Sequence, residues 1–167
     1  MEFGIRYAMV TIDDPVVLLA AIRRIAKETG TRIVLFDADQ MAGRVHAASA
    51  LAHAARSVER GDPIARTFEM EALLYAAGTR QTRIGRTFGL HEGENRCWVA
   101  VAPPADLAWA LLSALTRFEP DPCGLSPAHR RRLCDLFEIT PAELAIVGED
   151  RLAELVLERV ALLDANR

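Results

Sequence analysis

The sequence predicts a single α+β domain, with several helices packed in two layers on a small, mainly antiparallel sheet. Three observations support this fold class: few segments have the pattern of strands, many carry apolar residues at helical spacing, and capping residues separate the segments. With 167 residues, 51% of them hydrophobic, the chain can bury one core. We therefore expect one domain over 1–167.

The N-terminal part predicts strand, helix and strand. Residues 3–12 alternate between apolar and small or polar side chains, which is the period of a strand. A helix is expected over 15–29, because Asp13-Asp14-Pro15 is typical of a helix start and Gly30 of a helix end. The short apolar run 33–36 predicts a second strand.

The middle of the chain predicts three helices. Alanine and valine recur at spacings of three and four over 41–60, which indicates a helix. Thr67 is a suitable cap for the next helix, and Gly78 is expected to end it. Thr79 is expected to cap a shorter helix that ends near Gly89.

The last third predicts one strand and several helices. We expect a strand over 97–101, a helix from Pro103 to about Arg117 and a proline-rich loop over 119–127. Further helices are expected over 128–137, 140–146 and 149–164.

Composition argues for a protein of the cytoplasm and against several classes of site. There is no apolar run of roughly 20 residues and no signal-peptide pattern, so neither a membrane span nor secretion is expected. The three cysteines, Cys97, Cys123 and Cys134, form no C-x-x-C pair, which argues against a disulfide framework and a thiolate zinc site. His46 and His53 stand seven apart rather than four, so we expect no metal. The glycine-rich cofactor and phosphate motifs are missing too, so no cofactor and no small-molecule substrate is expected.

One string resembles an enzyme motif. An apolar strand followed by Asp37-Ala38-Asp39 is similar to the nucleophile motif of haloacid dehalogenase phosphatases, and 146–150 is similar to their acidic metal motif. However, Gln40-Met41 replaces the expected Gly-Thr, and the one lysine lies upstream of the motif. Both aspartates can instead cap the helix that begins near Met41. The phosphatase remains the alternative function from the enzyme class.

Net charge is −3, but the charge is unevenly spread: residues 41–100 hold eight arginines and six acidic residues, whereas residues 101–167 hold seven basic and eleven acidic residues. All basic residues except one lysine are arginine. A polar stripe with spacings of three and four consists of His46, Ser49, His53, Arg56 and Arg60. A second set with a spacing of three consists of Arg80, Arg83 and Arg86. Such surfaces can hold phosphates, although an ordinary solvated helix face gives the same pattern.

Apolar residues surround most of the C-terminal helix. Leu152, Leu155, Val156, Val160 and Leu163 share one face, and Ala153, Leu157 and Ala161 lie on another. A surface helix needs only one apolar stripe, so one face is expected to pack inside and the other to contact a partner.

Residues 66–90 carry a resemblance to a known family. This segment contains Glu71-Ala72-Leu73-Leu74, a break at Gly78, a helix with Gln81, and Phe88-Gly89-Leu90. It resembles the TPRKB family, the kinase-binding accessory subunits of the KEOPS complex, and an archaeal-type member in particular. The resemblance extends over the chain and is closest over 41–102.

The resemblance implies a function without catalysis. KEOPS makes threonylcarbamoyladenosine in tRNA, and this regulatory subunit would bind the kinase-like ATPase and recruit tRNA through its 3′ CCA end. The expected tRNA-binding residues are Arg80, Arg83, Arg86, His46, Arg56, Arg60 and Tyr75, the last as an exposed stacking ring. The expected kinase-binding residues are Leu152, Leu155, Val156, Leu157 and Val160. A purely structural assembly subunit, whose arginines only face solvent, is the other alternative.

Overall fold

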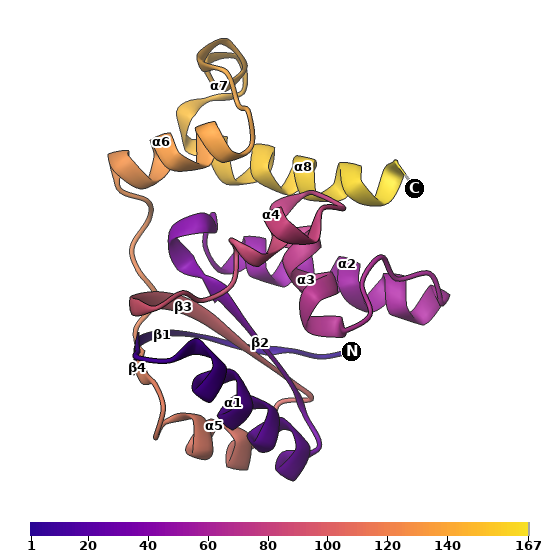
Figure 1. Cartoon of the computed structure of the whole chain (residues 1–167). Coiled ribbons are helices and arrows are strands. Elements are labelled where there is room, and N and C mark those ends of the chain that lie inside the picture. The colour runs from indigo at the N-terminus through magenta and orange to yellow at the C-terminus, as the bar shows by residue number, and fades with distance from the viewer. Residues whose placement is uncertain (167) are drawn as a thin grey trace.

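The computed structural model describes residues 1–166, and its centre is a four-stranded antiparallel sheet. The strands are β1 (Gly4–Ile12), β2 (Arg32–Asp37), β3 (Gly93–Ala102) and β4 (Arg117–Glu119). Their order is β2-β3-β1-β4, so β3 and β1 are central (Figure 1). The longest pairing joins β1 to β3, from Gly4 opposite Val101 to Ile12 opposite Gly93.

Helices occupy the rest of the fold. They are α1 (Pro15–Thr29), α2 (Arg44–Arg60), α3 (Phe68–Ala77), α4 (Thr82–Arg86), α5 (Asp106–Leu112), α6 (Pro127–Leu136), α7 (Pro141–Val147) and α8 (Leu152–Ala165), with short 3₁₀ turns η1 (Ala38–Gln40) and η2 (Glu149–Arg151). The Asp14 carboxylate caps α1, and Thr67 caps α3. Gly30, Gly61 and Gly78 end α1, α2 and α3 in left-handed conformation, as expected of glycine after a helix. None of the helices in this part of the chain is both long and apolar enough to span a lipid bilayer.

Both faces of the sheet are covered. Ile33 and Leu35 of β2 point into a core shared with α1 and α5, whereas Val34 and Phe36 point into a larger core shared with α2, α3, α6 and α8. Figure 1 shows α1 and α5 on one side of the sheet and the other helices on the opposite side. The predicted α+β class with an antiparallel sheet is confirmed. The layers differ from the expectation: helices lie on both faces, which gives three layers in place of two.

Three local differences from the sequence-based expectation have simple causes. The helix expected up to Arg117 ends at Leu112, and the next residues supply the short strand β4, which pairs with β1. Strand β3 begins at Gly93, inside the expected turn, because its polar first residues still pair with β1. Gln81, not Thr79, is the residue before α4; the Thr79 hydroxyl accepts a hydrogen bond from the Gln81 N–H instead.

His46 is part of the larger core. Its side chain is fully buried, the Ala42 N–H donates to Nδ1 (3.0 Å), and Nε2 lies 2.8 Å from the Ala76 carbonyl oxygen. Because Nδ1 accepts, the proton must be on Nε2, and the ring is neutral with both nitrogens satisfied. Burial lowers the pKa of His46 to about 4. The ring therefore joins the start of α2 to the end of α3.

We predict that His46 makes stability depend on pH. Its pKa of about 4 lies below the ordinary value, so unfolding takes up a proton between about pH 6.5 and 4. The free energy of unfolding should therefore fall as pH decreases through this window, by up to about 3 kcal/mol. Urea unfolding of wild type and His46→Gln across this range tests it. The variant should lose most of the slope, and His91→Gln, at an exposed histidine, should keep it. Equal slopes in wild type and His46→Gln would contradict this role.

Candidate nucleic-acid interface

The arginines of α4 project from the surface because the helix packs closely on α3. Gly78 turns the chain after α3 with φ of 63°, and Gly85 is buried so closely on Leu74 that an added Cβ would lie 2.9 Å from Leu74 Cδ2. One side of α4 is thus used for packing. Arg83 and Arg86 on α4, and Arg80 in the turn before it, are exposed, and they form no ion pair with other residues up to 166.

The end of α4 is joined to η1 and, through it, to α6. The Gln40 side-chain amide donates to the Thr87 carbonyl (3.4 Å), and the Asp37 N–H donates to the Phe88 carbonyl (2.8 Å). Gln40 also borders a shallow hollow whose other wall carries Arg131 and Arg132 of α6. Arginines from α4 and α6 therefore flank the same turn.

A larger hollow continues from this one and shares Ala128 and Arg132 with it. Its volume is about 820 Å³, and it lies between the central strands β1 and β3, η1 and the loop before α6. Its wall includes the Tyr7–Trp98 aromatic pair, whose ring centroids are 5.2 Å apart. Further lining residues are Asp39, Arg44, Arg96, Asp121, His129, Arg130 and Asp150.

Most arginines of the larger hollow are paired. Arg44 forms two hydrogen bonds to Asp121 (2.7 and 2.9 Å), lies over the Trp98 ring at 5.5 Å, and lowers the pKa of Asp121. Arg96 pairs with Asp39 at 2.9 Å. Arg132, by contrast, forms no ion pair within 1–166. The positive charge free to bind an anion therefore lies on α4 and on the side of α6 that faces η1.

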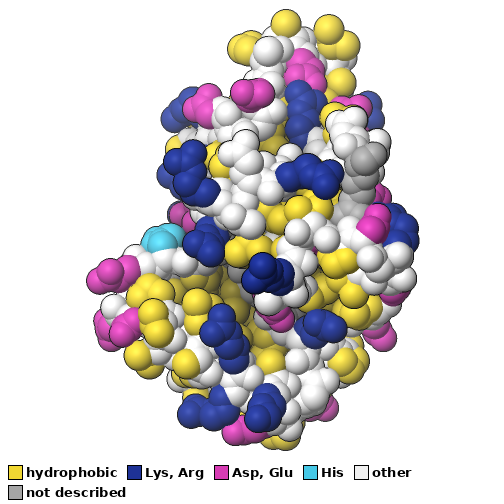
Figure 2. Space-filling model, turned by 45° about the vertical axis from the view of Figure 1, so that its right-hand side comes forward, with side chains coloured by type: hydrophobic (Ala, Val, Ile, Leu, Met, Phe, Trp, Pro, Cys, Tyr) yellow, Lys and Arg dark blue, Asp and Glu magenta, His cyan; other side chains and the backbone are white. Residues whose placement is uncertain are grey.

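Arginine and lysine side chains are spread over one face of the molecule, with hydrophobic side chains between them (Figure 2). This pattern suits a ligand that presents both phosphates and bases, because cationic side chains hold the former and apolar surface the latter.

Two of the expected tRNA-binding residues lie elsewhere. His46 is fully buried between α2 and α3, and Tyr75 is also fully buried, with its hydroxyl donating to Asp164 Oδ1 (3.0 Å). Neither side chain can reach a nucleic acid on the surface. The interpretation of Tyr75 as an exposed stacking ring is therefore wrong: its polar tip is satisfied inside the protein.

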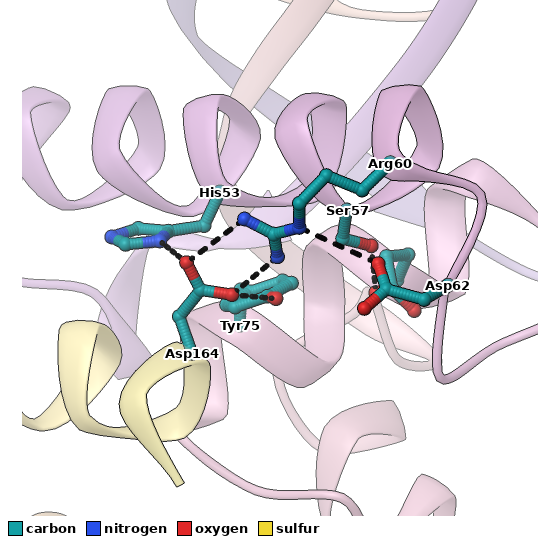
Figure 3. A network of polar contacts seen from close by, with 7 residues as sticks. His53, Ser57, Arg60, Asp62, Tyr75 and Asp164 are labelled. Carbon is teal, nitrogen blue, oxygen red and sulfur yellow. Dashed lines mark hydrogen bonds and ion pairs between the residues drawn. The ribbon is translucent and has the colours of Figure 1, made fainter. Parts of the chain in front are cut away.

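Two residues of the polar stripe on α2, His53 and Arg60, join a network with α8 (Figure 3). Asp164 of α8 accepts from Arg60 (2.6 Å) and lies 3.5 Å from the stacked His53 ring. Arg60, together with Tyr75, lowers the pKa of Asp164 to about 2. Burial, and then the charge of Arg56, lower the pKa of His53. Arg60 thus stabilises the attachment of α8, and Arg56 is the stripe's exposed arginine without an ion pair inside the described chain.

The expected partner-binding residues of α8 lie mostly in the core. Leu152, Leu155, Val156 and Val160 are all buried, and so cannot contact a partner. Leu157 is half-buried on another side of the helix, where Ala161 and Leu162 are exposed. The division into two faces holds, and the face available to a partner contains Leu157 rather than the four buried residues.

The aspartates of the phosphatase-like motif are held within the protein. Asp37 is buried, its Oδ1 accepts from the Asp39 N–H (3.0 Å), and burial raises its pKa. It caps η1, not the helix that begins at Arg44. In the described part of the chain, histidine, cysteine and acidic side chains form no group of three suited to a metal ion.

Sequence reasoning missed the residues that α6 and the larger hollow add. The run Arg130-Arg131-Arg132 was visible, but the acidic balance of the C-terminal third concealed its value. Tyr7 and Trp98 looked like ordinary strand residues, and no sequence signal places them beside α6.

Comparison with known proteins adds no family: no protein-family model matches this chain, and no curated protein matches it either.

We predict that the Asp164 network stabilises the fold. Asp164→Ala leaves the Tyr75 hydroxyl and Arg60 without this carboxylate, and should lower the free energy of unfolding by about 1–2 kcal/mol. Because the pKa of Asp164 is about 2, its contribution should be complete above about pH 4 and lost as pH falls through 2. Thermal unfolding at pH 7 and pH 2 measures both effects. Glu158→Ala, an exposed position on the same helix, is the control, and an equal loss there would contradict a specific role of the network.

Proposed function

We propose that this chain is a non-catalytic accessory subunit of the KEOPS complex, which binds the kinase-like ATPase and recruits tRNA through its 3′ CCA end. The proposal begins from the resemblance of residues 66–90 to the TPRKB family. This segment builds the α3–α4 unit, in which Gly78 and Gly85 allow the close packing that directs the arginines outward.

The observation that carries the proposal is the presence of exposed, unpaired arginines on α4 and on α6, of which those on α6 line a shallow hollow. Arg83 and Arg86 of α4, and Arg131 and Arg132 of α6, are exposed and have no ion-pair partner among residues 1–166. Proteins hold single-stranded nucleic acid with a cationic track for the backbone and aromatic or apolar surface for the bases. The half-buried Tyr7 on the wall of the adjoining hollow takes the place proposed earlier for Tyr75.

A single cationic patch is compatible with a small subunit that provides only part of the tRNA-binding surface of a large assembly. The net charge of the whole chain is −3, so it would offer one cationic patch rather than a whole binding surface.

We predict that reversing the charges of Arg80, Arg83 and Arg86 weakens tRNA binding without unfolding the protein. The triple variant Arg80→Glu, Arg83→Glu, Arg86→Glu replaces phosphate donors with repelling groups, and affinity should fall by roughly tenfold or more, with a weaker dependence on salt. Fluorescence anisotropy with tRNA, with and without the CCA end, measures this effect.

The matched control reverses Arg23, Arg24 and Lys27 on α1, across the sheet, with the same change in net charge. It should bind tRNA much like wild type. Equal binding by the α4 variant and wild type would remove the proposed surface, and equal binding of tRNA without CCA would remove the proposed end recognition.

We predict that the exposed side of α8 contacts the kinase-like subunit. Ala161→Glu should preserve the fold and weaken the complex, because it places a charge in an apolar contact. Val156→Glu should unfold the protein, because Val156 is fully buried. Circular dichroism and a pull-down with the kinase-like subunit test both. A folded Ala161→Glu variant that still binds normally would show that docking occurs elsewhere.

A further inference from the structure

The outer side of α1 carries an apolar patch. Val16, Val17 and Leu19 are 74%, 65% and 45% exposed, all within the first turns of the helix. Single exposed hydrophobic residues are ordinary, but three together on a helix with an apolar buried side form a patch. Ala20, the next outward residue, is small and exposed, and Leu107 of the neighbouring α5 is 58% exposed.

Charges of opposite sign lie at the two ends of this patch. Asp13 immediately precedes α1, and Arg23, Arg24 and Lys27 follow the patch. All four are exposed, and none forms an ion pair within the described residues. The spacing of three and four places Val17, Ala20 and Arg24 in one outward row of α1, and the exposed Asp13 lies outside the helix, just before its first turn. The outer side of α1 is therefore acidic before its start, apolar in its first turns and basic further along.

We propose that a second copy of this chain docks on α1, with the two α1 helices antiparallel about a two-fold axis. An axis beside Leu18 and Leu19 places Asp13 of each copy opposite Arg24 of the other, and Val17 opposite Ala20. Each charged end then meets its complement, and each valine meets a small residue that allows close approach.

Self-complementarity favours a second copy over another partner. A two-fold interface uses the same surface on both subunits, so every attraction occurs twice. A face with one sign of charge would repel its own copy, whereas a row that changes sign along its length attracts it when antiparallel.

The contact is small and leaves the other surfaces free. One pair of helices, with α5 at the rim, belongs to the low end of interface sizes, which is the weak and reversible class. Figure 1 shows α1 and α5 across the sheet from α4 and α8. The dimer therefore does not require the proposed tRNA or kinase contacts, and it does not rest on them.

Analytical ultracentrifugation of the full chain at low salt tests the proposal. Wild type should dimerise reversibly at high concentration. Asp13→Arg and Arg24→Glu should each weaken dimerisation by about fivefold or more, since each places like charges at both ends of the pairing. An equimolar mixture of the two variants should restore dimers, because the new arginine of one then lies opposite the new glutamate of the other. Asp13 is suitable because Asp14, not Asp13, caps α1.

Val17→Asp should also yield a monomer, since it places a charge in the centre of the patch. Glu59→Arg, an exposed reversal on α2, is the control and should dimerise like wild type. A wild-type chain that stays monomeric up to about 1 mM overturns the proposal. So does a mixture of the two charge variants that associates no better than either one alone.

Discussion

Burial of the central strand β3 on both faces is the constraint on which the rest of the structure depends. Trp98 and Ala100 face one core, and Cys97, Val99 and Val101 face the other, all with almost no exposed surface. A strand that is apolar on both sides needs a helical layer on each. The molecule is thereby divided into two outer surfaces that share no side chains, one formed by α1 and α5 and one by the remaining helices.

Much of the fold follows from local sequence signals. The elements that these signals did not predict are equally informative. Asp14, Thr67 and three glycines mark helix ends at the predicted places because capping depends on neighbouring residues only. Strand β4 has three residues and exists because β1 offers an open edge, which no local pattern records. The continuous apolar run in β3 is the one local pattern that is typical of burial on both faces of a sheet.

The candidate interface was predictable only in part. The placement of each side chain depends on whether its hydrogen-bond partners are near to it or far from it in the sequence. The spacing of Arg83 and Arg86 predicted their common outward direction, since that depends on helix geometry alone, whereas Arg80 is exposed in the turn before α4. His46 and Tyr75 looked like surface residues because a polar atom of each has its partner far away in the sequence. The Ala76 carbonyl and the Asp164 carboxylate come from 30 and 89 residues away. An aromatic side chain with a polar atom can lie in the core or on the surface. Only the tertiary fold decides which of the two it is.

Arginine content says little about binding until each side chain is placed. Arg44, Arg60 and Arg96 are held by acidic residues, and their first effect is to fasten α2, α8 and β3 to their neighbours. The arginines of α4 have no such partner in the described chain, and Gln40 of η1 contacts both the residue after α4 and the hollow lined by Arg131 and Arg132. The Asp164 network also determines how firmly α8 is attached to the helices beneath it. Because α8 is fastened to α2 and α3, a protein docked on its outer side would be held rigidly relative to α4. Under the proposed function, the chain would then act as a fixed spacer between kinase and tRNA, and positioning alone would suffice without a conformational signal.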